Sequence, residues 1–243
     1  MIELNKIYFQ DCLEGMKLID DKSIDMILCD LPYGTTTCKW DVIIPFDKLW
    51  FQYKRIIKEN AAIILTATQP FTSLLINSNL DLFKYELIWE KDRPSNPLIA
   101  NKRIMPRHEN ILIFYKKQPK FYPQKEIRKE KDKRNNIKDC SHATDTKGNI
   151  NLITSIGNSS HVHPSSIIKD MGRGNGLHPT QKPIKLFEYL IKTYTDEGNL
   201  VLDNCIGSGT TALACINLKR NFIGFESNEE YYKIACNRIR QND

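Results

Sequence analysis

The sequence lacks the features that mark metal-binding, secreted or membrane proteins. Its seven cysteines are scattered and form no Cys-x-x-Cys pair, so metal-ligand spacing is absent and reduced thiols are the default. The N-terminal residues Met-Ile-Glu-Leu-Asn-Lys contain no apolar signal core. No uninterrupted apolar run approaches the roughly 20 residues that cross a bilayer. We therefore expect a soluble, cytoplasmic protein without a metal ion or a membrane partner.

The excess of positive charge is also small. Thirty-five basic and 29 acidic residues give a net charge of +6, which permits nucleic acid as a partner but does not require it. A chain of 243 residues can bury one good core. One domain that carries an insertion is therefore favoured over two domains.

Short apolar segments alternate with polar corners and amphipathic stretches along the chain. Helical spacing marks residues 13–19 and 46–57, with Asn60 after the second, and further helices are expected after Pro70, near Pro183 and at 212–218. The candidate strands are 6–9, 24–29, 61–65, 85–89, 111–115, 199–203 and 221–226. This repetition predicts a doubly wound, mostly parallel, seven-stranded Rossmann-like α/β sheet with helices on both faces.

The segment Asp30-Leu31-Pro32-Tyr33 follows directly after one of the buried strands. Ligands of open α/β sheets bind at the carboxyl ends of strands, and Pro32 favours an extended backbone at Leu31. The carboxylate of Asp30, the oriented carbonyl of Leu31 and the ring of Tyr33 thus lie within four residues. Two such acceptors could hold the hydrogens of a nucleobase amine while the ring stacks on a base flipped out of its helix. By itself, the same pattern also fits an ordinary turn.

A glycine-rich corner follows the strand that ends at Asp203. Gly207 and Gly209 allow close backbone approach to a ligand, and the helix start attracts an anion. Glu226 ends the next strand, about twenty residues after the corner, where an acid typically accepts hydrogen bonds from ribose hydroxyls. A dinucleotide such as NAD fits this spacing as well, although the full Gly-x-Gly-x-x-Gly pattern is missing.

A basic stretch interrupts the alternating pattern. Between Lys116 and Lys138 there are ten Lys or Arg residues and three acids. We interpret 118–176 as an inserted target-recognition region that faces DNA, between a catalytic half, 1–117, and a cofactor-binding half, 177–243. A solvated charge run is the alternative. The candidate DNA-binding residues are Lys39, Lys116, Lys117, Lys120, Lys125, Arg128, Lys129, Lys133 and Arg134.

Three motifs together resemble one enzyme family. Asp30-Leu31-Pro32-Tyr33 resembles the Asp-Pro-Pro-Tyr motif of DNA amino-methyltransferases, and 203–211 resembles their Asp-Pro-Phe-x-Gly-Ser-Gly-Thr motif. Residues 178–183, His-Pro-Thr-Gln-Lys-Pro, match a family segment without change. Catalytic motif, basic insertion and cofactor motif follow in the order of the β class. The departures are Leu31 for the first proline, and Asn204 and Cys205 for Pro and Phe.

The resemblance implies S-adenosylmethionine as methyl donor and double-stranded DNA as substrate, in a restriction-modification setting. Asp30, Leu31, Pro32 and Tyr33 would be catalytic, and Glu226 would hold the ribose. The cofactor-binding set it implies is Asp11, Cys12, Asp30, His178, Thr180, Gln181, Lys182, Asp203, Cys205, Gly207, Ser208, Gly209, Thr210, Thr211 and Glu226. A homodimer is possible by the same analogy. Asp11 has a second interpretation as a helix N-cap.

Several functions remain open at this stage. The acid at position 30 resembles the adenine-N6 enzymes, whereas cytosine-N4 enzymes more often carry Ser there, so adenine is favoured. Cytosine-C5 transfer needs a cysteine after a proline, and no cysteine follows one. A non-catalytic nucleic-acid-binding module on the same fold is a further alternative, as is an NAD-dependent oxidoreductase. The intact segment 178–183 disfavours the oxidoreductase.

Overall fold

The computed structural model describes residues 2–36, 38, 40–127, 142–144, 150–152, 160–173 and 181–241, with the backbone alone at 142–144 and 150–152. The chain divides into two compact units, Met1–Tyr122 with Ser166–Asp243, and Pro123–Ser165. Residues 118–122 and 166–173, which the sequence analysis assigned to the insertion, thus belong to the first unit. The second unit holds two antiparallel ladders: β6 (Glu126–Ile127) with β9 (His161–Val162), and β7 (His142–Thr144) with β8 (Ile150–Leu152).

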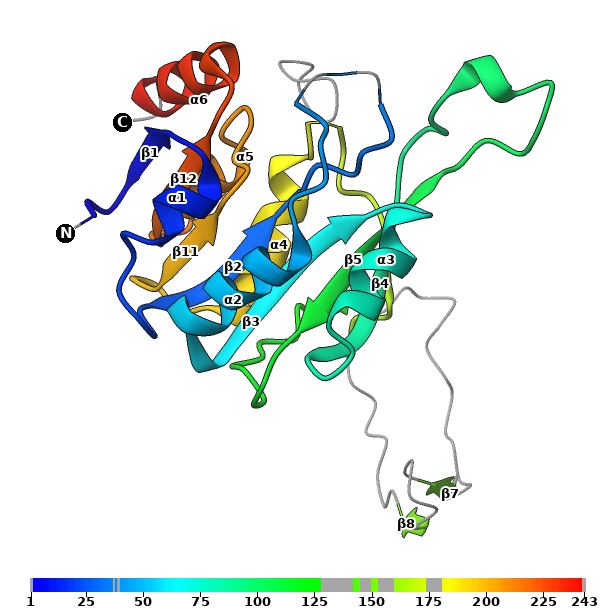
Figure 1. Cartoon of the computed structure of the whole chain (residues 1–243). Coiled ribbons are helices and arrows are strands. Elements are labelled where there is room, and N and C mark those ends of the chain that lie inside the picture. The colour runs from blue at the N-terminus through cyan, green and yellow to red at the C-terminus, as the bar shows by residue number, and fades with distance from the viewer. Residues whose placement is uncertain are drawn as a thin grey trace. The chain divides into compact units, whose positions relative to one another are not determined.

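The first unit is built on an eight-stranded sheet in the order β1-β12-β11-β2-β3-β5-β4-β10 (Figure 1). Its strands are β1 (Lys6–Phe9), β2 (Ile24–Cys29), β3 (Ile57–Ala67), β4 (Phe83–Glu90), β5 (His108–Phe114), β10 (Ile167–Ile168), β11 (Leu200–Asp203) and β12 (Asn221–Glu226). Only β5 is antiparallel to its neighbours, β3 and β4. The predicted, mostly parallel α/β fold is confirmed, and β10 is an eighth strand that the sequence did not indicate.

Helices cover both faces of this sheet (Figure 1). They are α1 (Cys12–Met16), α2 (Phe46–Ile56), α3 (Phe71–Ser78), α4 (Ile184–Tyr194), α5 (Thr210–Asn217) and α6 (Glu229–Arg240), with a 3-10 turn η1 (Pro97–Ile99). Side chains alternate between the faces of a strand. Met26 and Leu28 of β2 therefore pack in the core that includes α4 and α5, whereas Ile27 and Cys29 pack in the core that includes α1, α2 and α3.

The start of β3 differs from the prediction. The sequence placed the strand at 61–65 after a helix reaching Ile57, but the helix ends at Ile56 and extended backbone begins at Ile57. Ile57 pairs with Ile24, and a register shift follows before Met26 pairs with Ala62. The sequence did not indicate this early start, because β3 begins with polar residues and only its later part is buried on both faces. The polar residues are Lys58, Glu59 and Asn60.

Candidate active site

A cavity of about 460 Å³ lies at the carboxyl ends of the parallel strands. Four acids that each follow or end a strand line it: Asp11 after β1, Asp30 after β2, Asp203 in β11 and Glu226 in β12. Its walls also include apolar side chains, among them Leu31, Val42, Ile206 and Phe225. A volume in this range, with an apolar lining and a few convergent polar groups, suits a small-molecule ligand.

Asp30 is the centre of a hydrogen-bond network in this cavity. Its Oδ1 accepts hydrogen bonds from the Tyr33 hydroxyl, at 2.6 Å, and from the Thr66 hydroxyl. Its Oδ2 lies 2.5 Å from Nζ of Lys182. The carboxylate is thus oriented by donors from two strand ends and from the segment before α4, and its side chain keeps 22% exposure.

The Tyr33 ring contacts one aromatic ring and one cation. It stacks on Phe71 with a centroid distance of 5.1 Å and an interplanar angle of 27°. Nζ of Lys182 lies 5.7 Å from the Tyr33 centroid. Burial, and next the charge of Asp30, raise the pKa of the Tyr33 phenol, so the hydroxyl stays protonated and acts as a donor.

Lys182 joins two carboxylates in a buried position. Its side chain is 4% exposed, and Nζ lies 3.2 Å from Oε2 of Glu109 as well as close to Asp30. Lys91 in turn lies 2.5 Å from Oε1 of Glu109. Burial disfavours the charged amine, but the two carboxylates outweigh it and raise the pKa of Lys182. The ammonium is therefore maintained, since a buried charge is retained only when it is paired.

Both glycines of the glycine-rich corner have positive φ. Gly207 has φ of 53° and Gly209 has φ of 82°, and Gly209 is the N-cap of α5. Asp203 accepts hydrogen bonds from the Thr211 hydroxyl and from the backbone amide of Cys205. Burial raises the pKa of Asp203 to about 7, although both hydrogen bonds oppose the shift.

Glu226 is held by backbone amides on both sides of its carboxylate. Oε2 accepts from the Gly207 amide at 2.9 Å and Oε1 accepts from the Asn228 amide at 2.8 Å. Burial raises the pKa of Glu226, and these amides oppose the shift. Because a carboxylate offers about four acceptor positions, Glu226 retains capacity toward the cavity that it lines.

Asp11 and Cys12 begin α1 beside the same cavity. Oδ1 of Asp11 accepts from the amides of Leu13 and Glu14, at 2.9 and 3.2 Å, which makes Asp11 the N-cap of the helix. The alternative interpretation as a cap is therefore correct, and it coexists with a place at the cavity wall.

Of the two departures in the cofactor motif, Asn204 and Cys205, the structure explains Asn204. Asn204 is 2% exposed, and its Oδ1 accepts from the Tyr53 hydroxyl at 2.5 Å. Its amide donates to Sγ of Cys205 at 3.4 Å. The buried amide is thus satisfied, as buried polar groups generally are. Cys205 lines the cavity.

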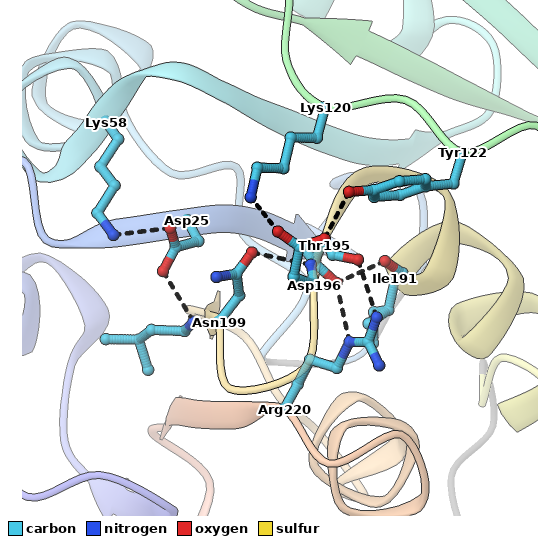
Figure 2. A network of polar contacts seen from close by, with 10 residues as sticks. Asp25, Lys58, Lys120, Tyr122, Ile191, Thr195, Asp196, Asn199 and Arg220 are labelled. Atoms are coloured by element: carbon cyan, nitrogen blue, oxygen red, sulfur yellow. Dashed lines mark hydrogen bonds and ion pairs between the residues drawn. The ribbon is translucent and has the colours of Figure 1, made fainter.

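Three predicted DNA-binding lysines of the first unit, Lys116, Lys117 and Lys120, lie at the opposite end of the sheet. Lys116 and Lys117 both pair with Glu59, near the start of β3. Lys120 pairs with Asp196, which also accepts a hydrogen bond from Tyr122 at 2.6 Å (Figure 2). These acids lie near the amino ends of β3 and β11, whereas the cavity lies at the carboxyl ends.

Other predicted residues fall elsewhere. Lys125 is exposed and belongs to the second unit. Gln181 lines the cavity, as do Pro32, Ser208 and Thr210. Seven further predicted residues lie outside the described residues: Lys39, Arg128, Lys129, Lys133, Arg134, His178 and Thr180.

Two members of the Asp30 network, Thr66 and Glu109, were not predicted from the sequence. Thr66 is the last residue but one of β3, and the adjacency of β2 and β3 brings its hydroxyl to Asp30. Glu109 is an acid at the start of the apolar strand β5, and it is 7% exposed. An acid next to an apolar run could have indicated a buried ion pair, because a carboxylate buried to this degree requires a partner.

The described residues contain neither a cluster of metal ligands nor a membrane-spanning helix. No group of three or more His, Cys, Asp or Glu side chains in that part of the chain could hold a metal ion. Over the same residues, no helix combines the length and the apolar character needed to span a membrane.

Comparison with known proteins identifies similar sequences and structures. The sequence model of a DNA methylase family matches residues 24–237. Type II methyltransferase M1.MboII of Moraxella bovis is 27% identical over 97% of this chain and 96% of its own length. Type II methyltransferase M.HpaI of Haemophilus parainfluenzae is 27% identical over 96% of this chain and 74% of its own.

Solved structures show the same fold. The complex of M1.HpyAVI with SAM has a TM-score of 0.62 and 26% identity, and the match covers 96% of this chain and 98% of that one. The cytosine-N4-specific PvuII DNA methyltransferase has a TM-score of 0.64 and 18% identity, over 96% and 85%. At that identity the second likeness concerns the fold alone.

Proposed function

Since the chain belongs to the DNA methylase family, we propose that it transfers a methyl group from S-adenosylmethionine to the N6 amino group of adenine in double-stranded DNA. The observation that carries the proposal is one cavity that unites Asp30 and Tyr33 with the glycine-rich corner and Glu226. The proposed acceptor, Asp30, the Tyr33 ring and the glycine-rich corner thus all line the same cavity.

The lining of the cavity fits the proposed cofactor. Glu226 has acceptor capacity for ribose hydroxyls, and the apolar residues Ile206 and Phe225 suit a purine ring. Asp203 and the backbone of 207–211 would hold the methionine end. His178, Thr180, Gln181 and Lys182 remain proposed neighbours of that end. When bound, the cofactor supplies a methyl group on a positively charged sulfur.

The residues of this chain would then activate and position the amine. Asp30 and the Leu31 carbonyl accept its two hydrogens, which frees the nitrogen lone pair from the ring. Tyr33 would stack on the flipped base and hold the amine nitrogen toward the methyl group that the cofactor would supply. As the nitrogen–carbon bond forms, the carbon–sulfur bond would break and leave a neutral thioether. A proton of the methylated nitrogen leaves toward Asp30. Fixing two reactants in one geometry supplies the main part of the rate.

The arrangement around Asp30 adds one requirement. Tyr33, Thr66 and Lys182 all contact the carboxylate, so the amine must share Asp30 with them or displace one. Displacing the Tyr33 hydroxyl would free its ring to turn toward the base. Lys182 and Thr66 can remain, because a carboxylate accepts about four hydrogen bonds.

Adenine is proposed over cytosine because residue 30 is an acid in a segment that resembles the adenine enzymes. A cytosine-N4 activity is the alternative within the family. Sequencing that detects modified bases, applied to DNA from cells that express the protein, distinguishes the two. N6-methyladenine at a fixed site supports the proposal, and N4-methylcytosine contradicts the choice of base.

The role of Asp30 is tested by Asp30→Ala. Because Asp30 belongs to the amine side of the cavity, the variant should lose methyl transfer and bind S-adenosylmethionine within about twofold of the parent. Asp203→Ala is the matched variant on the other side, and it should weaken the binding measured by calorimetry. Equal weakening of cofactor binding by both variants contradicts the assigned roles.

A further inference from the structure

The β4–β5 hairpin carries an arm, residues 91–107, at the same end of the sheet as the cavity. Glu90 of β4 pairs with His108 of β5, so the arm begins and ends at one point. β4 runs in the same direction as β3, since both are antiparallel to β5, and β3 is parallel to β2, which ends beside Asp30. Figure 1 shows this arm extending beyond the carboxyl ends of the strands.

The arm has internal structure. Near its root, the Lys91 amide donates to the Arg107 carbonyl at 2.9 Å. Further out, the Ser95 amide donates to the Pro106 carbonyl at 2.8 Å, and the 3-10 turn η1 forms the tip. These backbone contacts give the arm a defined course, so the side chains along it have defined neighbours.

The arm carries basic side chains and exposed large apolar side chains. Lys91 and Arg107 pair with Glu109 and Glu90 near the root. The remaining basic residues are exposed, and no ion pair is found for them within the described part of the chain: Arg93, Lys102 and Arg103. Leu98 and Ile104 are 90% and 95% exposed, among the most exposed large apolar side chains described.

We propose that this arm docks on duplex DNA beside the target base, an inference that rests on the proposed function. Arg93, Lys102 and Arg103 contact phosphates, and Leu98 and Ile104 enter the base stack. Basic groups that neutralise phosphates supply affinity, and apolar side chains inserted between base steps open the stack. The arm thereby helps to release the base that Asp30 and Tyr33 receive.

The root of the arm is linked to the reacting centre. Lys91 pairs with Glu109, Glu109 pairs with Lys182, and Lys182 pairs with Asp30. This places the docking surface and the acceptor on one chain of charged contacts. By contrast, Lys116, Lys117 and Lys120 are paired at the other end of the sheet.

A second copy of the chain is the rival occupant of this surface. An interface that joins two such arms would bring like charges together, since 91–107 contains five basic residues and one acid, Asp92. Like-charge juxtaposition opposes association, whereas a polyanion complements it. Duplex DNA is therefore the favoured partner.

The phosphate contacts are tested with Arg93→Ala/Lys102→Ala/Arg103→Ala. Affinity for a random-sequence duplex is measured by fluorescence anisotropy over a range of salt concentrations. Loss of three phosphate contacts should reduce the slope of log affinity against log salt by about 2 to 3. The matched control, Lys17→Ala/Lys54→Ala/Lys192→Ala, removes three lysines at α1, α2 and α4 and should change the slope by less than about 1. Equal slopes in the two variants overturn the proposal.

The apolar contacts are tested with Leu98→Ser/Ile104→Ser on the same duplex and on one with a central mismatch. Opening a paired stack requires more free energy than opening a mismatch. The variant should therefore lose about tenfold in affinity for the paired duplex and less for the mismatched one, at an unchanged salt slope. A change from dimer to monomer in sedimentation, with DNA affinity retained, identifies the second copy as the occupant and overturns the proposal.

Failure of the arm and failure of the proposed function give different results. If the parent protein binds duplexes through the arm but methylates no DNA, the proposed function fails and the docking surface stands. If the parent methylates DNA and the arm variants bind and methylate as it does, the docking surface fails alone.

Discussion

Nζ of Lys182 lies 2.5 Å from Oδ2 of Asp30, although the two residues are 152 positions apart in the chain. The contact joins the segment that resembles a cofactor motif to the residue proposed to hold the target amine. It is buried on the Lys182 side, and Glu109 completes it. Removing the Lys182 cation would take the ammonium away from Asp30 and leave Lys91 as the cation beside Glu109.

Lys182→Met should therefore shift the pH dependence of methyl transfer. The ammonium that favours an ionised acceptor at Asp30 is then absent, so the acidic limb of the kcat profile should move to higher pH. Lys182→Arg retains the charge and should shift the limb less. If kcat falls equally at every pH, Lys182 does not act through the charge of Asp30.

Asp203 should make stability fall as pH rises. Its pKa in the folded state is about 7, whereas an unfolded Asp titrates near about 3.9. Between these values the folded state binds the proton and the unfolded state does not. The free energy of unfolding should thus decrease by up to about 1.4 kcal/mol per pH unit, and this contribution is lost above about pH 7.

Asp203→Asn should remove that slope. Urea unfolding without cofactor, measured between about pH 5 and about pH 8, compares the variant with the parent. Asp47→Asn changes an exposed acid in the first turn of α2 and serves as the control. A slope that Asp203→Asn leaves intact shows that another group causes it.

Gly209 should tolerate alanine less well than Gly198. Both have positive φ, 82° and 80°, but a Cβ at Gly209 would meet Cβ of Ala235 at 3.2 Å, whereas one at Gly198 would have no neighbour within 4 Å. Gly198→Ala should cost about 1–2 kcal/mol from the backbone alone, and Gly209→Ala more. Chemical denaturation measures both values, and an equal cost would mean that α6 moves aside without loss.

Tyr53→Phe should destabilise the protein by about 1–3 kcal/mol, because Oδ1 of the buried Asn204 loses its donor. Tyr53→Phe/Asn204→Leu should regain most of this, since both polar partners are then absent. Tyr115→Phe removes a hydroxyl that bonds an exposed Gln118 and should change stability by less than about 0.5 kcal/mol. If the double variant were less stable than Tyr53→Phe alone, the hydrogen bond between Tyr53 and Asn204 would not explain the loss.

Local pattern determined much of the architecture. Apolar periodicity and polar corners marked the seven principal strands, because burial on one or both faces leaves a signal within each segment. Local sequence also indicated Asp30 and Tyr33 after β2 and the glycines before α5, because a turn requires particular residue types. The start of β3 and the two residues of β10 carried too little of that signal.

Contacts between distant segments were decided by the tertiary structure alone. A sequence does not show which acid a lysine will pair with. The basic stretch that begins at Lys116 therefore gave no indication that its lysines pair with Glu59 and Asp196. The same reason hid the joining of Lys182 to Asp30 and Glu109. An ion pair depends on which strand ends become adjacent, and only the packed sheet fixes that order.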